Sequence, residues 1–187
     1  FLMKSPFFFL IKPVGQEYNN TIEIAGQKIV INSTVENHKH VNRFAEIIQV
    51  PIHYNGDIKP GDTIIVHHNV FRIYYDVKGR AKKSPNFFKD DIYFIDSFQF
   101  YMYHNGDEWC SVEDWCFVKP IDKENTYLYE EGLEENTGTV VYSNKTLYSR
   151  KVKNGSLIKF SSNSEYEFVV NDELLYRMNT KDVIALI

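Results

Sequence analysis

The chain has 187 residues, of which 43% are apolar, 25% charged and 16% aromatic, and its formal net charge is -4. This composition is that of a globular protein, and the length suffices for one large β domain or two small ones. The acidic balance excludes attraction of a nucleic-acid backbone by the molecule as a whole, so any such contact needs a local basic patch.

The first apolar stretch runs from Pro6 to Ile11 and is interrupted by Lys12-Pro13. It is too short to span a bilayer, and no small-residue cleavage site follows it. We therefore expect it to be the first strand of a protein that has no membrane partner.

The two cysteines, Cys110 and Cys116, each adjoin a tryptophan, Trp109 and Trp115. Two cysteines at this spacing make neither a disulfide framework nor a zinc knuckle, which favours a reducing, cytoplasmic location. We expect these four residues to pack at a junction between two units rather than to form a redox site.

Short runs of Val, Ile, Phe and Tyr alternate with turn signals such as Asn55-Gly56-Asp57 and Asn105-Gly106-Asp107. No segment keeps a helical apolar period for three turns, so the pattern predicts an all-β sandwich or barrel. The expected strands are 7–12, 28–32, 43–50, 63–67, 70–76, 91–95, 100–103, 115–119, 138–142, 156–160, 165–169, 174–178 and 183–187.

Four sequence blocks occur twice in the same order, which indicates an internal duplication. The paired blocks are Leu10–Val14 with Phe117–Ile121, Phe44–Ile48 with Gly138–Val141, Ile58–Val66 with Val152–Phe160, and Ile92–Met102 with Leu175–Ala185. We predict two units, 6–104 and 115–187, joined by a junction over 105–114.

The block order resembles that of the chaperonin-10 (GroES-type) co-chaperonin family. The closest stretch is Gly155–Ile158 with Glu173–Ile187, and the first unit adds Gly61–Val66 and Gly26–Ile31. The resemblance implies two tandem, partly open GroES-like β-barrels in a homo-oligomer that contacts a GroEL-type chaperonin ring to assist protein folding. The tandem arrangement also resembles the double co-chaperonin of chloroplasts in architecture, and the unusual length points to a divergent, viral version.

In that family, a loop between the first two strands presents a short apolar tripeptide to the chaperonin. By the resemblance, Ile29, Val30 and Ile31 occupy this place within a loop over 15–35. The alternative is that these three residues form a buried strand of the barrel. The second unit departs from the family because its corresponding segment, 122–136, is acidic and has no aliphatic tripeptide.

The first unit carries a basic hairpin insertion over 72–89 that the family lacks. Its cations Arg72, Lys78, Arg80, Lys82 and Lys83 are interleaved with aromatic residues, as in nucleic-acid binders. A solvated hairpin tip above aromatic core residues explains the same pattern. We favour this second interpretation and keep the cations as a possible nucleic-acid or assembly patch, without expecting nucleic acid as the partner.

No catalytic, phosphate-binding or dinucleotide-binding motif is found in the chain, so we expect neither an enzyme nor a cofactor. His67 and His68 are adjacent in a predicted strand, which directs their side chains to opposite faces and away from a shared ion. His38 and His40 lie in a polar loop without an evident third ligand, and we expect no metal site.

Three functions remain open at this point, of which nucleic-acid binding through 72–89 is the third. The first is the co-chaperonin-like one. The second is a non-catalytic structural or adaptor protein, for instance of a virus particle, that reuses the same barrel for assembly.

Overall fold

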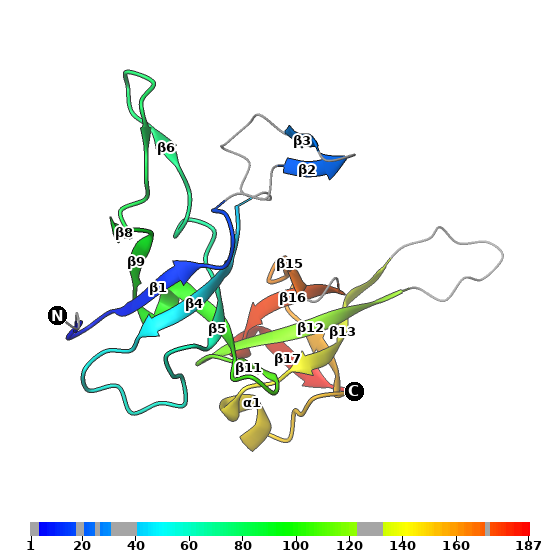
Figure 1. Ribbon diagram of the computed structural model, residues 1–187. Coiled ribbons are helices and arrows are strands. Elements are labelled where there is room, and N and C mark those ends of the chain that lie inside the picture. Colours follow the sequence, from blue (N-terminus) through cyan, green and yellow to red (C-terminus); the bar gives the residue numbers. More distant parts are fainter. Residues whose placement is uncertain (1–3, 18–20, 25–26, 31–40, 123–132, 171–172) are drawn as a thin grey trace. The chain divides into compact units, whose positions relative to one another are not determined.

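The computed structural model describes residues 4–17, 21–24, 27–30, 41–122, 133–170 and 173–187. The chain divides into two compact units, Phe1–Glu108 (unit 1) and Trp109–Ile187 (unit 2), shown in Figure 1. The division falls within the segment 105–114 that the sequence marks as a junction.

Unit 1 is built on an antiparallel sheet in which the strands follow the order β10-β5-β4-β1-β9-β8. These strands are β1 (Phe9–Pro13), β4 (Phe44–Gln49), β5 (Thr63–Val66), β8 (Phe87–Lys89), β9 (Ile92–Ile95) and β10 (Phe100–His104). A 3-10 turn, η2 (Ser97–Gln99), joins β9 to β10.

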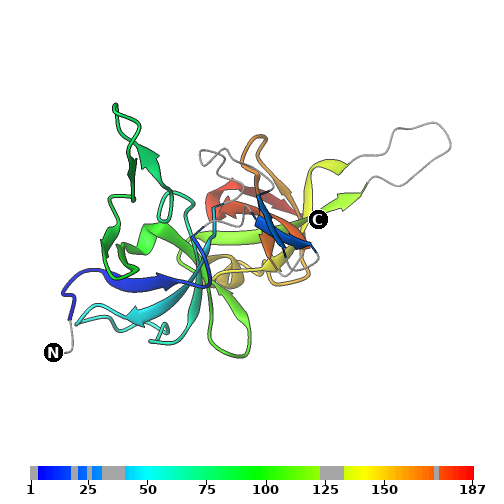
Figure 2. The ribbon, with the colours of Figure 1, turned by 45° about the horizontal axis from the view of Figure 1, so that its top comes forward.

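Two short hairpins of unit 1 form separate two-stranded sheets. The first pairs β2 (Thr21–Ile24) with β3 (Gln27–Val30), in the connection between β1 and β4. The second pairs β6 (Tyr74–Tyr75) with β7 (Ala81–Lys82), between β5 and β8. The β6–β7 hairpin extends away from the larger sheet in both views (Figure 1, Figure 2).

Alternation along the strands builds the core of unit 1. In β4, Ala45 and Ile47 are buried while Glu46 is exposed, as expected where one face of a strand packs inward. Ile64 and Ile65 of β5 are both fully buried, so this strand is covered on both faces.

Unit 2 begins with β11 (Trp109–Ser111) and forms an antiparallel sheet in the order β15-β16-β12-β13-β14-β17. The sheet strands are β12 (Trp115–Asp122), β13 (Leu133–Tyr142), β14 (Leu157–Phe160), β15 (Tyr166–Val170), β16 (Glu173–Asn179) and β17 (Val183–Leu186). A short helix, α1 (Lys145–Ser149), follows β13, and a 3-10 turn, η3 (Thr180–Asp182), precedes β17. The core gathers Cys116, Val118, Val140, Leu147, Val152, Ile158, Phe160 and Met178.

The two sheets have the same strand order. The two sets correspond in chain order and in sheet order: β1, β4, β5, β8, β9 and β10 of unit 1 match β12, β13, β14, β15, β16 and β17 of unit 2. The registers agree as well, because Pro13 pairs with Ala45 in unit 1 as Pro120 pairs with Gly138 in unit 2.

A turn before the third sheet strand repeats in atomic detail. Gly61 N–H donates to Ile47 O at 2.8 Å, and Gly155 N–H donates to Val140 O at 2.7 Å. Both glycines have φ near +90°, at +95° and +85°, a conformation that other residues adopt only with strain. The two units therefore share a strand order, the pairing of Pro13 and Pro120, and the geometry of this turn.

The prediction of an all-β chain is confirmed. No closed barrel is found among the described strands of either unit. The pairing of the described strands closes neither sheet: β8 is a terminal strand of the sheet of unit 1, and β15 and β17 are the terminal strands of the sheet of unit 2. The GroES-like character of the two units stays a prediction.

Two expected elements of unit 1 are wrong. The strand expected over 70–76 reduces to β6, because Val70 N–H donates to His67 O and the chain turns after β5. The insertion expected over 72–89 has other bounds, because β8 belongs to the large sheet, where it pairs with β9 as β15 pairs with β16. The extra segment of unit 1 is the connection 67–86, which in unit 2 is only 161–165.

Candidate functional site

Two of the three predicted partner-binding residues, Ile29 and Val30, lie in the β2–β3 hairpin. Ile29 pairs with Ile22 and Val30 pairs with Thr21, in a two-stranded sheet separate from the large sheet of unit 1. Ile31 lies outside the described residues. The hairpin occupies the connection between β1 and β4, the first two strands of the large sheet.

Buried Asn42 joins the two ends of this connection. Its Nδ2 donates to the carbonyl oxygens of Val14 and Gln16, both at 2.8 Å, and its Oδ1 accepts from Phe44 N–H at 2.9 Å. The side chain is only 3% exposed and satisfies three backbone groups. The backbone of Asn42 adds a fourth bond, from its N–H to Glu17 O at 2.9 Å.

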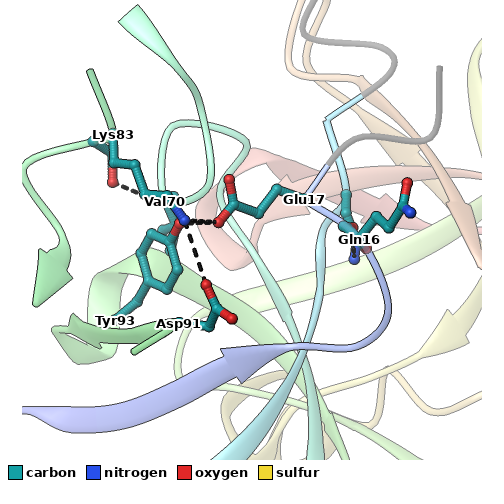
Figure 3. Close-up of polar contacts among 8 residues, drawn as sticks. Gln16, Glu17, Val70, Lys83, Asp91 and Tyr93 are labelled. Atoms are coloured by element: carbon teal, nitrogen blue, oxygen red, sulfur yellow. Dashed lines mark hydrogen bonds and ion pairs between the residues drawn. The ribbon is translucent and has the colours of Figure 1, made fainter. Parts of the chain in front are cut away.

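A charged cluster lies at the base of this connection, where its two ends meet. It borders an open depression of about 530 Å³ whose lining includes Gln16, Glu17, Lys83 and Asp91. Lys83 Nζ lies 2.5 Å from Glu17 Oε1 and 3.4 Å from Asp91 Oδ1 (Figure 3). Tyr93 donates its hydroxyl proton to the same Glu17 Oε1 at 2.5 Å. The cluster thus joins β9 and the segment after β7 to the chain that leads from β1 to β2.

The electrostatics of Lys83 follow from these neighbours. Partial burial acts to lower the pKa of Lys83, but hydrogen bonds and charge attraction from Glu17 and then Asp91 outweigh it, so the pKa is raised. Its ammonium also lies 4.6 Å from the centre of the Phe87 ring. Lys83 therefore stays charged and engaged within unit 1 rather than presented to an external phosphate.

The tip of the β6–β7 hairpin is organised by Asp76. Its Oδ1 accepts from Lys78 N–H and Arg80 N–H, each at 2.9 Å, and its Oδ2 lies 3.9 Å from Lys82 Nζ. Gly79, at φ +71°, completes the turn with an N–H bond to Asp76 O. The carboxylate partly balances the charge of the tip.

The five predicted basic residues do not share one set of contacts. Arg72 lies at the root of the hairpin with its guanidinium 5.2 Å from the Tyr74 ring, and Lys83 belongs to the cluster with Glu17. Lys78, Arg80 and Lys82 remain exposed near the tip. The arrangement favours a structured, partly neutralised hairpin over a continuous nucleic-acid track.

The expected geometry of the histidine pair is wrong. β5 ends at Val66, so His67 and His68 lie in a turn rather than a strand, and their ring centres are only 4.1 Å apart. His67 Nδ1 accepts from Asn69 N–H at 3.1 Å. Within the described ranges, no group of three or more His, Cys, Asp or Glu side chains could hold a metal ion. His38 and His40 lie outside those ranges.

Two of the four residues expected to pack at the junction, Trp115 and Cys116, make contacts inside unit 2. Cys116 is fully buried in the unit 2 core, and burial raises the pKa of its thiol to about 12. Trp115 stacks on Arg177, whose guanidinium lies 4.5 Å from the indole and 4.6 Å from the ring of Tyr166. Cys116 is thus a core residue that is poorly reactive as a nucleophile.

Sequence reasoning missed Glu17, Asn42 and Tyr93 as residues of the candidate site. Glu17 and Lys83 are 66 positions apart, and neither carries a motif that predicts their contact. For Asn42, a polar residue just before the expected strand 43–50 was the only local signal.

No helix in the described part of the chain has the length and apolar character needed to cross a membrane. Comparison with models of known protein families gives no match, and comparison with curated proteins gives none either.

Proposed function

We propose that the chain is a non-catalytic, co-chaperonin-like protein that oligomerises and contacts a GroEL-type chaperonin ring through the β2–β3 hairpin of unit 1. The observation that carries the proposal is the place of this hairpin. It interrupts the connection between the first two sheet strands, outside the large sheet, in one of two units that otherwise share a strand order.

The energetics require several copies acting together. Each aliphatic side chain buried on a partner contributes about 1.5–3 kcal/mol, while each residue that becomes ordered costs about 1–2 kcal/mol. A hairpin with four cross-strand pairs already formed loses less on binding than an open loop does. One hairpin remains a weak binder, so useful affinity depends on a ring of subunits that engage at once.

A second candidate is a structural or adaptor protein, and the edge strand β17 favours it. Ile184, Leu186 and Ile187 are 68%, 54% and 62% exposed along the last strand of the unit 2 sheet. β17 also borders a depression of about 660 Å³ that reaches Leu147. An apolar edge of this kind suits assembly with other chains. Assembly without affinity for a chaperonin is the outcome that selects this function.

The test is retention of the protein on an immobilised GroEL-type ring in the presence of nucleotide. Ile29→Asp and Val30→Asp should each abolish retention, whereas the matched control Val77→Asp should not. Val77 is fully exposed on the other hairpin of the same unit, so it receives the same aliphatic-to-acid change without touching β2–β3. Equal retention of all four proteins, or none by the wild type, rejects the proposal.

The mass of the native assembly separates the alternatives further. A stable monomer contradicts both candidates, since each depends on an oligomer. A ring that the chaperonin does not retain rejects the first candidate and supports the second.

A further inference from the structure

We propose that Lys83 is a positioning residue: through it, the segment inserted between β5 and β8 holds the base of the connection that carries the β2–β3 hairpin. The proposal rests on the proposed function only in taking that hairpin as the binding element.

The inserted segment places the Lys83 ammonium next to Glu17. Lys83 directly follows β7, in the connection 67–86, whose counterpart in unit 2 is only 161–165. It reaches Glu17, which lies 66 residues earlier in the chain, just after β1. The contact with Glu17 therefore comes from a segment that unit 2 has only in shorter form.

The contact differs from an ordinary surface ion pair because its carboxylate has a second donor. Glu17 is only 16% exposed, and its Oε1 receives both the Lys83 ammonium and the Tyr93 hydroxyl at 2.5 Å. Tyr93 is itself fully buried, so its hydroxyl offers a fixed second donor. Charge-assisted hydrogen bonds held by a rigid partner lose little entropy when they form.

Glu17 also binds the far end of the connection, through its backbone carbonyl. Its carbonyl oxygen accepts from Asn42 N–H at 2.9 Å, and the Asn42 side chain binds the carbonyl oxygens of Val14 and Gln16. Releasing the Glu17 side chain should thus loosen a bond between the two ends. The amide hydrogen of Asn42 reports this opening, because it exchanges with solvent only when its bond to Glu17 O breaks.

The experiment measures hydrogen exchange at Asn42 in the full chain. Lys83→Gln should accelerate it roughly two- to fivefold, the range for a partly exposed ion pair. Lys82→Gln, the matched control, removes the same charge from a 67% exposed neighbour that lies 3.9 Å from Asp76. It should leave Asn42 exchange unchanged. Tyr93→Phe keeps the buried ring, removes only the second donor, and should also accelerate exchange.

The same variants are then measured for affinity to the immobilised chaperonin ring. Weaker binding by Lys83→Gln but not by Lys82→Gln supports the positioning role. Unchanged Asn42 exchange in both Lys83→Gln and Tyr93→Phe overturns the proposal, and so does faster exchange with unchanged binding. If the wild type does not bind at all, the proposed function fails, while faster exchange in Lys83→Gln still supports the brace itself.

Discussion

A methyl group at Gly138 tests the packing between the first two strands of unit 2. Gly138 lies in β13 opposite Pro120 of β12, and its backbone is outside the left-handed region. A Cβ placed there would meet Val118 Cγ1 at 2.3 Å and Lys119 O at 2.8 Å. Gly138→Ala therefore tests steric space and not backbone strain.

The magnitude follows from how little the neighbours can move. Carbon atoms pack best about 3.5–4.0 Å apart, so the contact with Val118 is more than 1 Å too close. Val118 is fully buried, and Lys119 O belongs to a strand that pairs with β16 on its other side. Overpacking of this kind costs about 1–3 kcal/mol, offset by about 0.4–1 kcal/mol because alanine restricts the unfolded chain.

Tryptophan fluorescence during urea unfolding measures the effect, because both tryptophans, Trp109 and Trp115, belong to unit 2. With a slope of about 1–3 kcal/mol per molar urea, the midpoint should fall by roughly 0.5–1 M. Val118→Ala should be less harmful in the Gly138→Ala background than alone, because it removes one of the two clashes. A midpoint at or above that of the wild type refutes the packing argument.

Further predictions concern one buried amide and the two thiols. Asn42→Ala should lower the free energy of unfolding by about 2–4 kcal/mol, since three backbone groups lose their partner. Asn42→Asp should be no better in the same urea titration, because a carboxylate cannot donate to two carbonyl oxygens. A thiol reagent at pH 8 should label the half-buried Cys110 in the native protein but Cys116 only on unfolding; fast native labelling of both contradicts the burial of Cys116. Because burial raises the pKa of Cys116 to about 12, its neutral thiol contributes its full stabilisation below about pH 9, and this contribution falls as the pH rises toward 12. Cys116→Ala lacks this titration, so its free energy of unfolding should fall less than that of the wild type over the same range.

The repeat could be predicted from sequence because each block combines a turn signal with a strand. When the block Ile58–Val66 is aligned with the block Val152–Phe160, Ile64 is aligned with Ile158. In the structure, Ile64 pairs with Ala45 and Ile158 pairs with Gly138, at equivalent positions of the two sheets. A glycine that needs positive φ before an apolar run is a local signal, and it gave the right register.

Elements decided by a single side-chain bond could not be predicted. The run from Val70 to Tyr75 has strand composition, but the chain turns at His67, whose ring accepts from Asn69 N–H. Helix α1 has only five residues, too few for an apolar period, and begins because Asn144 Oδ1 accepts from Leu147 N–H at 2.8 Å.

The role of Lys83 depends on long-range contacts and was invisible in the sequence. Lys82 and Lys83 are adjacent and chemically identical, yet one lies near Asp76 of its own hairpin and the other reaches Glu17. Only the fold distinguishes them, and it separates the five expected basic residues that sequence reasoning grouped together.

The most direct test of the proposed function is hydrogen exchange of the wild-type protein with and without a GroEL-type ring and nucleotide. We predict that the ring slows exchange of the amides from Gln27 to Val30, in strand β3. Slowing confined to the β6–β7 hairpin, or no change in β3, would contradict the assignment of β2–β3 as the binding element.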